Sequence, residues 1–167
     1  MSEINKIKKK DFWLEKFDFF SISGKDSKRF LNGLTTGNII NPNDQILKTC
    51  WLSPNGILKS LLEIKFQENK IDIISLEGDI NKIKQFFNDV IFPTDDVLIS
   101  DSFSLNRFQE IDEINSWKII QPIYFKSENQ EYELFKKNIN ILNINKIKSW
   151  KINQAIPSLD NEINGKN

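Results

Sequence analysis

The chain has 167 residues, and its 23 basic and 23 acidic side chains give a formal net charge of zero. That balance argues against a surface that follows nucleic-acid phosphates, which requires clustered positive charge. One cysteine, Cys50, excludes an internal disulfide and a cysteine-built metal site, and the lack of histidine removes the commonest zinc ligand and general base. The 13 phenylalanines and four tryptophans predict a packed core.

The N-terminal region is basic rather than apolar. Residues 1–11 contain the cluster Lys6-Ile7-Lys8-Lys9-Lys10, which we interpret as a solvated, flexible arm; contact with nucleic acid or a membrane is the less favoured alternative. No apolar stretch resembles a signal peptide or the roughly 20 residues of a membrane span. We therefore expect a cytoplasmic protein that binds neither membranes nor nucleic acid directly.

The first predicted elements are a strand and a short helix. Residues 17–23 favour extended backbone, Gly24 ends the strand, and Asp26 or Ser27 is expected to cap the helix that follows. The helix is predicted to bury three apolar side chains: Phe30, Leu31 and Leu34. A turn containing Thr35-Thr36 is expected between two glycines.

A hairpin is predicted next. Strands over residues 46–53 and 57–66 flank Pro54-Asn55-Gly56, whose residue types favour a tight turn. A loop at residues 53–56 that contacts a ligand is the less favoured alternative. The two-residue period divides the second strand into an inward face and an outward face. The inward face is expected to hold Leu58, Leu62, Ile64 and Phe66. The outward face is expected to hold Lys59, Glu63 and Lys65. A fourth strand is predicted over residues 71–76.

The strongest helical pattern covers residues 79–90. Asp79 can cap this helix, and a stripe of apolar residues recurs at helical spacing: Ile80, Ile83, Phe86, Phe87 and Val90. The remaining predicted elements are strands near 96–100, 104–111 and 117–125, a helix near 131–138, a strand at 139–142 and a helix opened by Asn143. Pro157 is expected to end that region.

Mixed strands and helices with several hairpins predict an α+β fold with a mostly antiparallel sheet and packed helices. One domain is expected over residues 12–160, followed by a frayed tail at 161–167.

Three groups of residues have both a chemical and a structural interpretation. Asp95-Asp96 resembles a carboxylate pair for acid–base chemistry, but its position after Pro93-Thr94 favours a solvated turn. Cys50 lies within a predicted strand, which favours an inert rather than a reactive thiol. Core packing is favoured over ligand stacking for three tryptophans: Trp51, Trp117 and Trp150. No phosphate loop, catalytic triad or metal-ligand spacing is found.

Four segments in order resemble the aminomethyltransferase-like folate-binding family. They are Ile22-Ser23-Gly24-Lys25-Asp26-Ser27, the stretch from Phe30 to Ile39 with its Thr-Thr turn, Leu52-Ser53-Pro54-Asn55-Gly56-Ile57-Leu58, and the closing segment from Trp150 to Pro157. The resemblance covers roughly residues 12–164, and it rests on the order in which the four segments occur.

Within that family, the chain most resembles the YgfZ branch of the glycine cleavage T-protein superfamily. The resemblance implies the N-terminal folate-binding part of such proteins and a role in iron–sulfur protein maintenance and tRNA modification. Tetrahydrofolate is the implied ligand, and iron–sulfur proteins are implied partners. The implied folate-binding residues are Leu52, Ser60, Ser75 and Asn153.

The chain departs from the family pattern at positions that matter chemically. Where the aminomethyltransferases carry a catalytic Asp pair, this chain has Lys59 and Ser60, and a lysine cannot accept the substrate amine's proton as a carboxylate would. Asn153 replaces a Glu that binds the pteridine ring, and a neutral amide only partly replaces a carboxylate. The expected protein is therefore not an enzyme, and its folate affinity is expected to be reduced.

The Lys-Gly-Cys-Tyr-x-Gly-Gln motif of the YgfZ branch does not occur in the sequence, and Cys50 is not its equivalent. A truncated or split gene product is one interpretation of this difference. Three hypotheses follow, in order of preference: a YgfZ-like folate-binding accessory protein, a degenerate fragment that keeps the fold without binding folate, and a tetrahydrofolate-dependent aminomethyltransferase.

Overall fold

The computed structural model describes residues 9–43, 45–111 and 122–153. Two compact units divide this part of the chain. The larger unit comprises residues 17–104, and the smaller unit comprises residues up to 16 together with those from 105 onward. Two strands, β1 (Asp11–Ser23) and β6 (Phe103–Glu110), contribute residues to both units.

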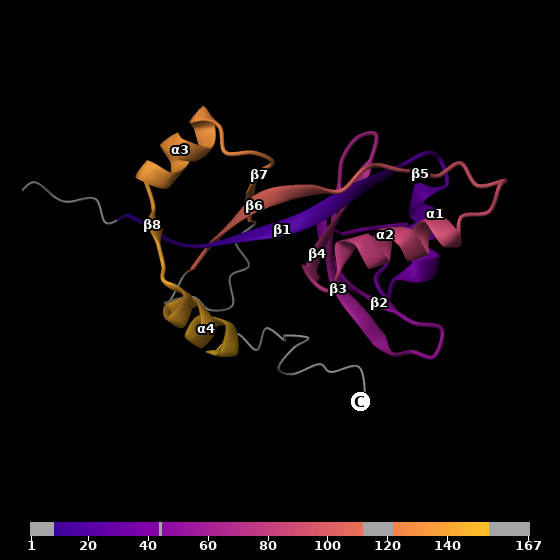
Figure 1. Cartoon of the computed structure of the whole chain (residues 1–167), viewed down its shortest axis with the longest axis horizontal. Helices are drawn as coiled ribbons and strands as arrows, with labels where there is room; N and C mark the ends of the chain where they lie inside the picture. Colours follow the sequence, from indigo (N-terminus) through magenta and orange to yellow (C-terminus); the bar gives the residue numbers. More distant parts are fainter. Residues whose placement is uncertain (1–8, 44, 112–121, 154–167) are drawn as a thin grey trace, which may run out of the picture. The chain divides into compact units, whose positions relative to one another are not determined.

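The larger unit is an antiparallel sheet with two helices (Figure 1). Its pairings give the strand order β2-β3-β4-β1, and β5 pairs with the end of β1. The other elements of this unit are α1 (Ser27–Leu34), β2 (Ile46–Leu52), β3 (Leu58–Phe66), β4 (Ile71–Glu77), α2 (Ile80–Asp89) and β5 (Leu98–Ile99).

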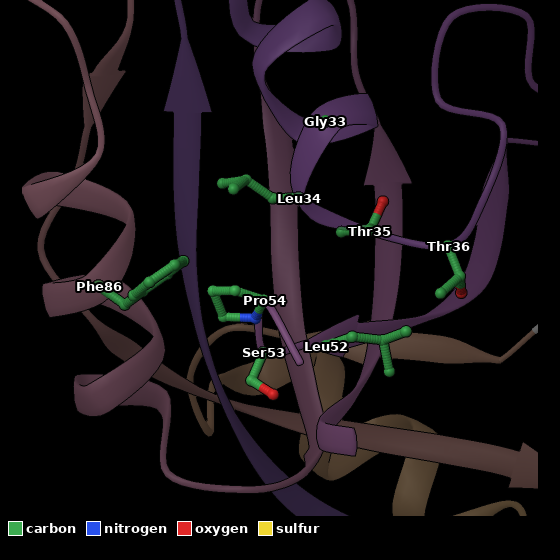
Figure 2. A pocket seen from close by; sticks show the side chains of 8 residues that line it. All are labelled: Gly33, Leu34, Thr35, Thr36, Leu52, Ser53, Pro54 and Phe86. Carbon is green, nitrogen blue, oxygen red and sulfur yellow. The ribbon is translucent and has the colours of Figure 1, made fainter. Parts of the chain in front are cut away.

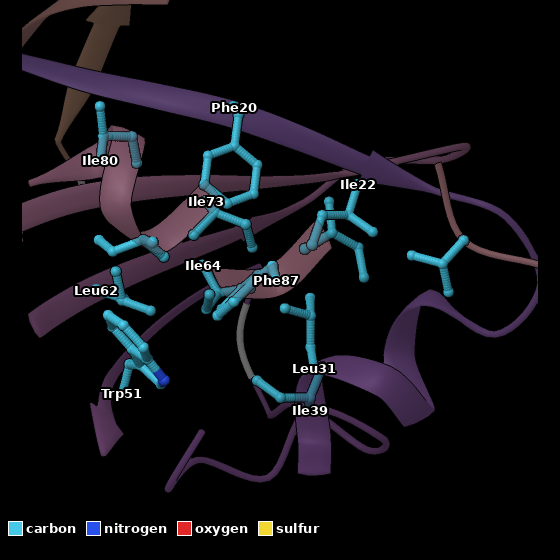
Figure 3. Packing of buried hydrophobic residues seen from close by; sticks show 13 residues of the cluster. Phe20, Ile22, Leu31, Ile39, Trp51, Leu62, Ile64, Ile73, Ile80 and Phe87 are labelled. Atoms are coloured by element: carbon cyan, nitrogen blue, oxygen red, sulfur yellow. The ribbon is translucent and has the colours of Figure 1, made fainter. Parts of the chain in front are cut away.

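Both helices of the larger unit pack against one face of its sheet (Figure 3). Phe87 of α2 lies at the centre of this core, and its ring meets the edges of Phe20 and Phe30 at centroid distances of 5.9 and 5.8 Å. The apolar helical stripes predicted from the sequence are thus confirmed, since Leu31, Ile83 and Phe87 are buried. Burial of such side chains contributes about 1.5–3 kcal/mol each.

The inward face predicted for β3 is correct for Leu62 and Ile64 but wrong for Leu58. Leu62 and Ile64 are fully buried in the core, whereas Leu58 is half-buried and lies outside the core cluster. The cause is a β-bulge: Ser60 pairs with Trp51, but Leu58 pairs with Leu52, so Lys59 is an extra residue. An inserted residue reverses the alternation of faces, which the two-residue period alone does not reveal.

Glu63 also differs from a solvated outward residue. It lies on the face opposite Leu62, as predicted, but its exposed fraction is 0%. Lys48 on β2 and Ile74 on β4 are its register partners.

The two helices of this unit begin in different ways. Asp79 caps α2 as predicted, because its carboxylate accepts from the N–H groups of Asn81 and Lys82. Asp26 occupies the cap position of α1, but its side chain makes no cap hydrogen bond. Its carboxylate instead accepts from the backbone N–H of Asp96 at 3.0 Å.

The loop containing Asp95 and Asp96 packs on the turn between β1 and α1. Asp95 forms an ion pair with Arg29 at 3.0 Å and accepts from the N–H of Phe92, while Asp96 accepts from the N–H of Lys25. Gly24 has φ +106°, and a Cβ there would lie 2.1 Å from the carbonyl oxygen of Asp96. These contacts support the structural interpretation of the two aspartates.

The smaller unit has its own aromatic core. Phe12, Phe108 and Tyr132 are buried, with Phe125 and Phe135 packed against them. Strands β6 and β7 pair antiparallel, while β8 pairs in parallel with the start of β1. The elements that this unit adds are β7 (Ile123–Phe125), α3 (Gln130–Lys137), β8 (Asn140–Ile141) and α4 (Ile144–Asn153).

Two helix caps and two N-terminal lysines make hydrogen bonds and an ion pair within the smaller unit. Asn129 caps α3 by accepting from the N–H of Tyr132, and Asn143 opens α4 as predicted, accepting from the N–H of Lys146. From the predicted basic arm, Lys10 pairs with Glu110 at 2.8 Å, and Lys9 donates to the carbonyl of Lys137. These two lysines are therefore part of the folded unit.

The predicted α+β class with a mostly antiparallel sheet is confirmed. The single domain over 12–160 stays a prediction. Several expectations lie outside the described residues: the start of the arm at 1–8, Trp117, Pro157 and the tail at 161–167. In the part of the chain that the structure describes, every helix is too short or too polar to cross a bilayer.

Candidate functional site

A pocket of about 270 Å³ lies in the larger unit, where the end of α1, the Thr-Thr turn, the hairpin and α2 meet (Figure 2). Its lining residues are Gly33, Leu34, Thr35, Thr36, Leu52, Ser53, Pro54 and Phe86. All eight are uncharged. The pocket is slightly smaller than the roughly 300–1,000 Å³ typical of ligand sites, which suits one ring system better than an extended molecule.

Hydrogen bonds to the edge of β2 fix the Thr-Thr turn. The N–H of Thr36 donates to the carbonyl of Cys50 at 3.0 Å, and the N–H of Cys50 donates to the Thr36 hydroxyl at 3.2 Å. Thr35 forms a bridge with Trp51, and its hydroxyl donates to the carbonyl of Leu31 at 3.0 Å. Both hydroxyls are therefore held in place by backbone groups.

The following Gly37 explains why the turn lies so close to β2. A Cβ at Gly37 would come within 2.8 Å of the Leu47 side chain and 3.0 Å of the Thr49 hydroxyl. Glycine allows this approach.

The hairpin tip forms the opposite rim of the pocket. The N–H of Gly56 donates to the carbonyl of Ser53 at 2.8 Å, closing a β-turn over Pro54 and Asn55. Gly56 has φ +77°, which favours glycine. The Ser53 hydroxyl accepts from the N–H of Ile57 at 3.1 Å. A hydroxyl has one donor and two acceptor sites, so this hydroxyl keeps its proton for a further partner.

One aromatic side chain, Phe86, forms the wall on the α2 side. Phe86 lines the pocket and packs on Trp51, with ring centroids 4.9 Å apart. Trp51 is 9% exposed, belongs to the core as predicted, and its indole N–H has no hydrogen-bond partner among the described residues. A planar ligand that stacks on Phe86 would extend this aromatic stack, an arrangement that stabilises ring pairs by about 0.5–1.5 kcal/mol.

The lining of the pocket does not supply acid–base chemistry. It presents three hydroxyls, an aromatic face and aliphatic walls, and it contains no carboxylate, amine, thiol or imidazole. Among the described residues, no group of three potential ligands could hold a metal ion. The geometry suits an uncharged planar ring with hydrogen-bonding edges.

The four residues predicted to bind folate fall in different places. Leu52 lines the pocket. Asn153 is the last residue of α4 and belongs to the smaller unit. The ligand role of all four stays a prediction.

Ser60 and Ser75 share a separate structural setting at the turn between β4 and α2. The fully buried Ser60 donates to the carbonyl of Glu77 at 2.5 Å, and the buried Ser75 donates to the carbonyl of Gly78 at 2.9 Å. Gly78 has φ +113°, and a Cβ there would lie 2.9 Å from the Ser60 hydroxyl. Neither serine lines the described pocket.

Some lining residues carried no sequence signal for a pocket. Gly33 and Thr35-Thr36 belong to the segment that carries the family resemblance, but nothing in their types indicated a cavity. Phe86 was predicted only as part of the buried stripe of its helix, and it is half-buried at the edge of that stripe.

A thiol and an amine elsewhere in the chain, those of Cys50 and Lys16, do not line the pocket. Cys50 is half-buried in β2 as a free thiol. Lys16 forms an ion pair with Glu128 at 3.0 Å in the smaller unit, and the hydrogen bond and charge of Glu128 raise the pKa of this lysine.

The fold of the described chain is α+β and resembles that of aminomethyltransferases. A similar solved structure is the glycine cleavage system aminomethyltransferase T from Bartonella henselae, with a TM-score of 0.50 and 10% sequence identity. The match covers 61% of this chain and 29% of that chain, so this chain spans less than a third of its neighbour's length. No family model and no curated protein matches the sequence.

Proposed function

We propose that this protein is a non-catalytic, folate-binding accessory protein of the YgfZ type, and that the pocket beside Phe86 receives the ring of a reduced folate. The observation that supports this most is the coincidence of an aminomethyltransferase-like fold with a neutral, aromatic-walled pocket that contains the predicted residue Leu52.

The pocket lining fits the ring of a folate better than its tail. Phe86 offers an aromatic face, and the Ser53 hydroxyl keeps its proton for a ring edge. Thr35 has donated its proton to Leu31 and Thr36 already accepts from Cys50, so these two hydroxyls offer only their remaining sites. The volume of about 270 Å³ leaves the acidic tail of a folate outside. Asn153 belongs to the smaller unit, so its contribution to binding is a separate proposal.

The proposed lack of catalysis rests on the residues near the bulge. Lys59 is exposed, and the Ser60 hydroxyl is already committed to the carbonyl of Glu77. Neither side chain provides the carboxylate that would take a proton from an aminomethyl donor. The purified protein should therefore release no ammonia from an aminomethyl-lipoyl carrier in the presence of tetrahydrofolate, and turnover above a no-protein control would overturn this part.

A cytoplasmic location, iron–sulfur proteins as partners and a link to tRNA modification are further parts of the proposal, which rest on the resemblance. A degenerate scaffold without folate binding is the second candidate. It is favoured by the hydroxyls of Ser60 and Ser75, which are used by the backbone rather than offered to a ligand.

Calorimetry with tetrahydrofolate separates the two candidates. Weak binding is expected, because a neutral amide at Asn153 replaces a charge-assisted hydrogen bond worth about 1.5–3 kcal/mol, or roughly tenfold to a hundredfold in affinity. Asn153→Glu should restore a similar factor, and Asn153→Gln is its uncharged control. Absence of binding by all three proteins would favour the scaffold, and tight binding that is unchanged by Asn153→Glu would remove Asn153 from the site.

A further inference from the structure

The described residues include two Asn-Gly pairs in contrasting settings. Asn55-Gly56 forms the tip of the hairpin, and Asn32-Gly33 lies inside α1. Asn-Gly is the dipeptide most prone to intramolecular deamidation, because glycine lets its backbone nitrogen approach the preceding side chain.

We propose that Asn55 is a site of spontaneous deamidation in the folded protein and that Asn32 is protected. The Gly56 nitrogen attacks Cγ of Asn55, a C–N bond forms, the Gly56 proton is lost to water, and the side-chain amide leaves as ammonia. Water then opens the resulting succinimide at either carbonyl, which gives aspartate or isoaspartate. No oxidant or reductant is needed, and water is the co-reactant.

The hairpin tip gives this reaction room. Asn55 and Gly56 are both exposed, and apart from the two chain neighbours of Gly56 no described residue has a heavy atom within 4 Å of the position that a Gly56 Cβ would occupy. The Asn55 amide makes no hydrogen bond within the described part of the chain. The Gly56 N–H donates to the carbonyl of Ser53, so attack requires opening of this one turn bond.

Asn32 is restrained at both reacting groups. Its side-chain oxygen accepts from the N–H of Ile39 at 3.0 Å, which holds the amide away from its own backbone. Gly33 lies within α1, where helical geometry points its nitrogen into the intrahelical hydrogen bond and away from Cγ. Attack at this pair requires the helix to unwind.

The modification would alter the rim of the pocket. Asn55 directly follows Pro54, which lines the pocket together with Ser53. Aspartate at this position would place a negative charge next to an uncharged lining. Isoaspartate would also insert a methylene into the main chain at the turn that the Ser53–Gly56 hydrogen bond closes.

Peptide mapping by mass spectrometry after incubation of the full chain in mildly alkaline buffer tests the proposal. Peptides containing Asn55 should gain the mass that replaces NH₂ by OH and separate into two isomers, several-fold faster than peptides containing Asn32. The same incubation in denaturing urea should bring the two rates together, since only the fold distinguishes them. Asn55→Gln should abolish the signal at the tip while leaving the circular dichroism spectrum unchanged.

Two outcomes would overturn the proposal. One is an unmodified Asn55 in the native protein under conditions where urea allows its deamidation, which would show that the turn protects it. The other is equal native rates at Asn32 and Asn55.

Discussion

The pocket rim and the β4–α2 turn both contain hydroxyl side chains, yet they use them differently. At the turn, Ser60 and Ser75 are buried, and each donates its proton to a backbone carbonyl. At the rim, Thr35 also donates its proton to a backbone carbonyl, but Ser53 accepts from the backbone, keeps its proton and borders an open volume. A hydroxyl can therefore bind a ligand only through the donor and acceptor sites that backbone groups leave unused.

The largest expected effect comes from the core that supports both regions. Leu62→Ala should lower the free energy of unfolding by about 2–5 kcal/mol, because it leaves a cavity among fully buried side chains. Leu58→Ala is the matched control on the same strand, and its half-buried side chain predicts a clearly smaller loss. Chemical denaturation measures both, and equal losses would contradict the bulge-shifted faces.

A second substitution tests the turn. Gly78→Ala should destabilise the protein by about 1–3 kcal/mol, because a Cβ at φ +113° is strained and would meet Ser60. Denaturant titration at equal protein concentration measures this loss. A neutral Gly78→Ala substitution would show that the turn is looser than described.

A third substitution removes one hydroxyl from the turn. Ser75→Ala should cost about 0.5–1.5 kcal/mol, the net contribution of one hydrogen bond, because it removes the donor to the carbonyl of the exposed Gly78. Ser53→Ala at the rim is the control, and it should cost less because that side chain is only half-buried. Thermal unfolding of the two variants compares them, and a larger loss at Ser53 would reverse the assignment.

The smallest expected effect has the opposite sign. Gly33→Ala should stabilise the protein by up to about 1 kcal/mol, because alanine favours a helix and its Cβ meets no atom within 4 Å. Gly33→Phe at the same position should occupy the pocket that this glycine lines and reduce ligand binding. Denaturation of the first variant and ligand titration of the second check these expectations.

Local patterns predicted the elements of this fold well. The apolar stripe of α2, the Asp79 cap and the Gly56 turn each depend on neighbouring residues, and the structure confirms all three. The bulge at Lys59 depends on the register between β2 and β3. The alternating pattern of one strand does not predict how that strand pairs with another. The same holds for Asp26, whose carboxylate accepts a hydrogen bond from the backbone N–H of Asp96, 70 residues further along the chain.

The candidate site was predicted less completely, for a related reason. Leu52 was predicted as a folate-binding residue from the family resemblance, and it lines the pocket, but Phe86 and Gly33 join it only through the packing of α1 and α2 on the sheet. Ser60 and Ser75 are two hydroxyls in strands, and the sequence does not reveal that the Glu77 and Gly78 carbonyls accept their protons.

The most direct test of the proposed folate site is calorimetric titration of tetrahydrofolate into the natural protein, Phe86→Ala and Ser75→Ala. We expect weak binding by the natural protein, a marked loss in Phe86→Ala because the aromatic wall is removed, and unchanged affinity in Ser75→Ala despite its lower stability. Unchanged binding in Phe86→Ala together with loss of binding in Ser75→Ala would contradict it, and would place the folate site at the β4–α2 turn instead of the pocket.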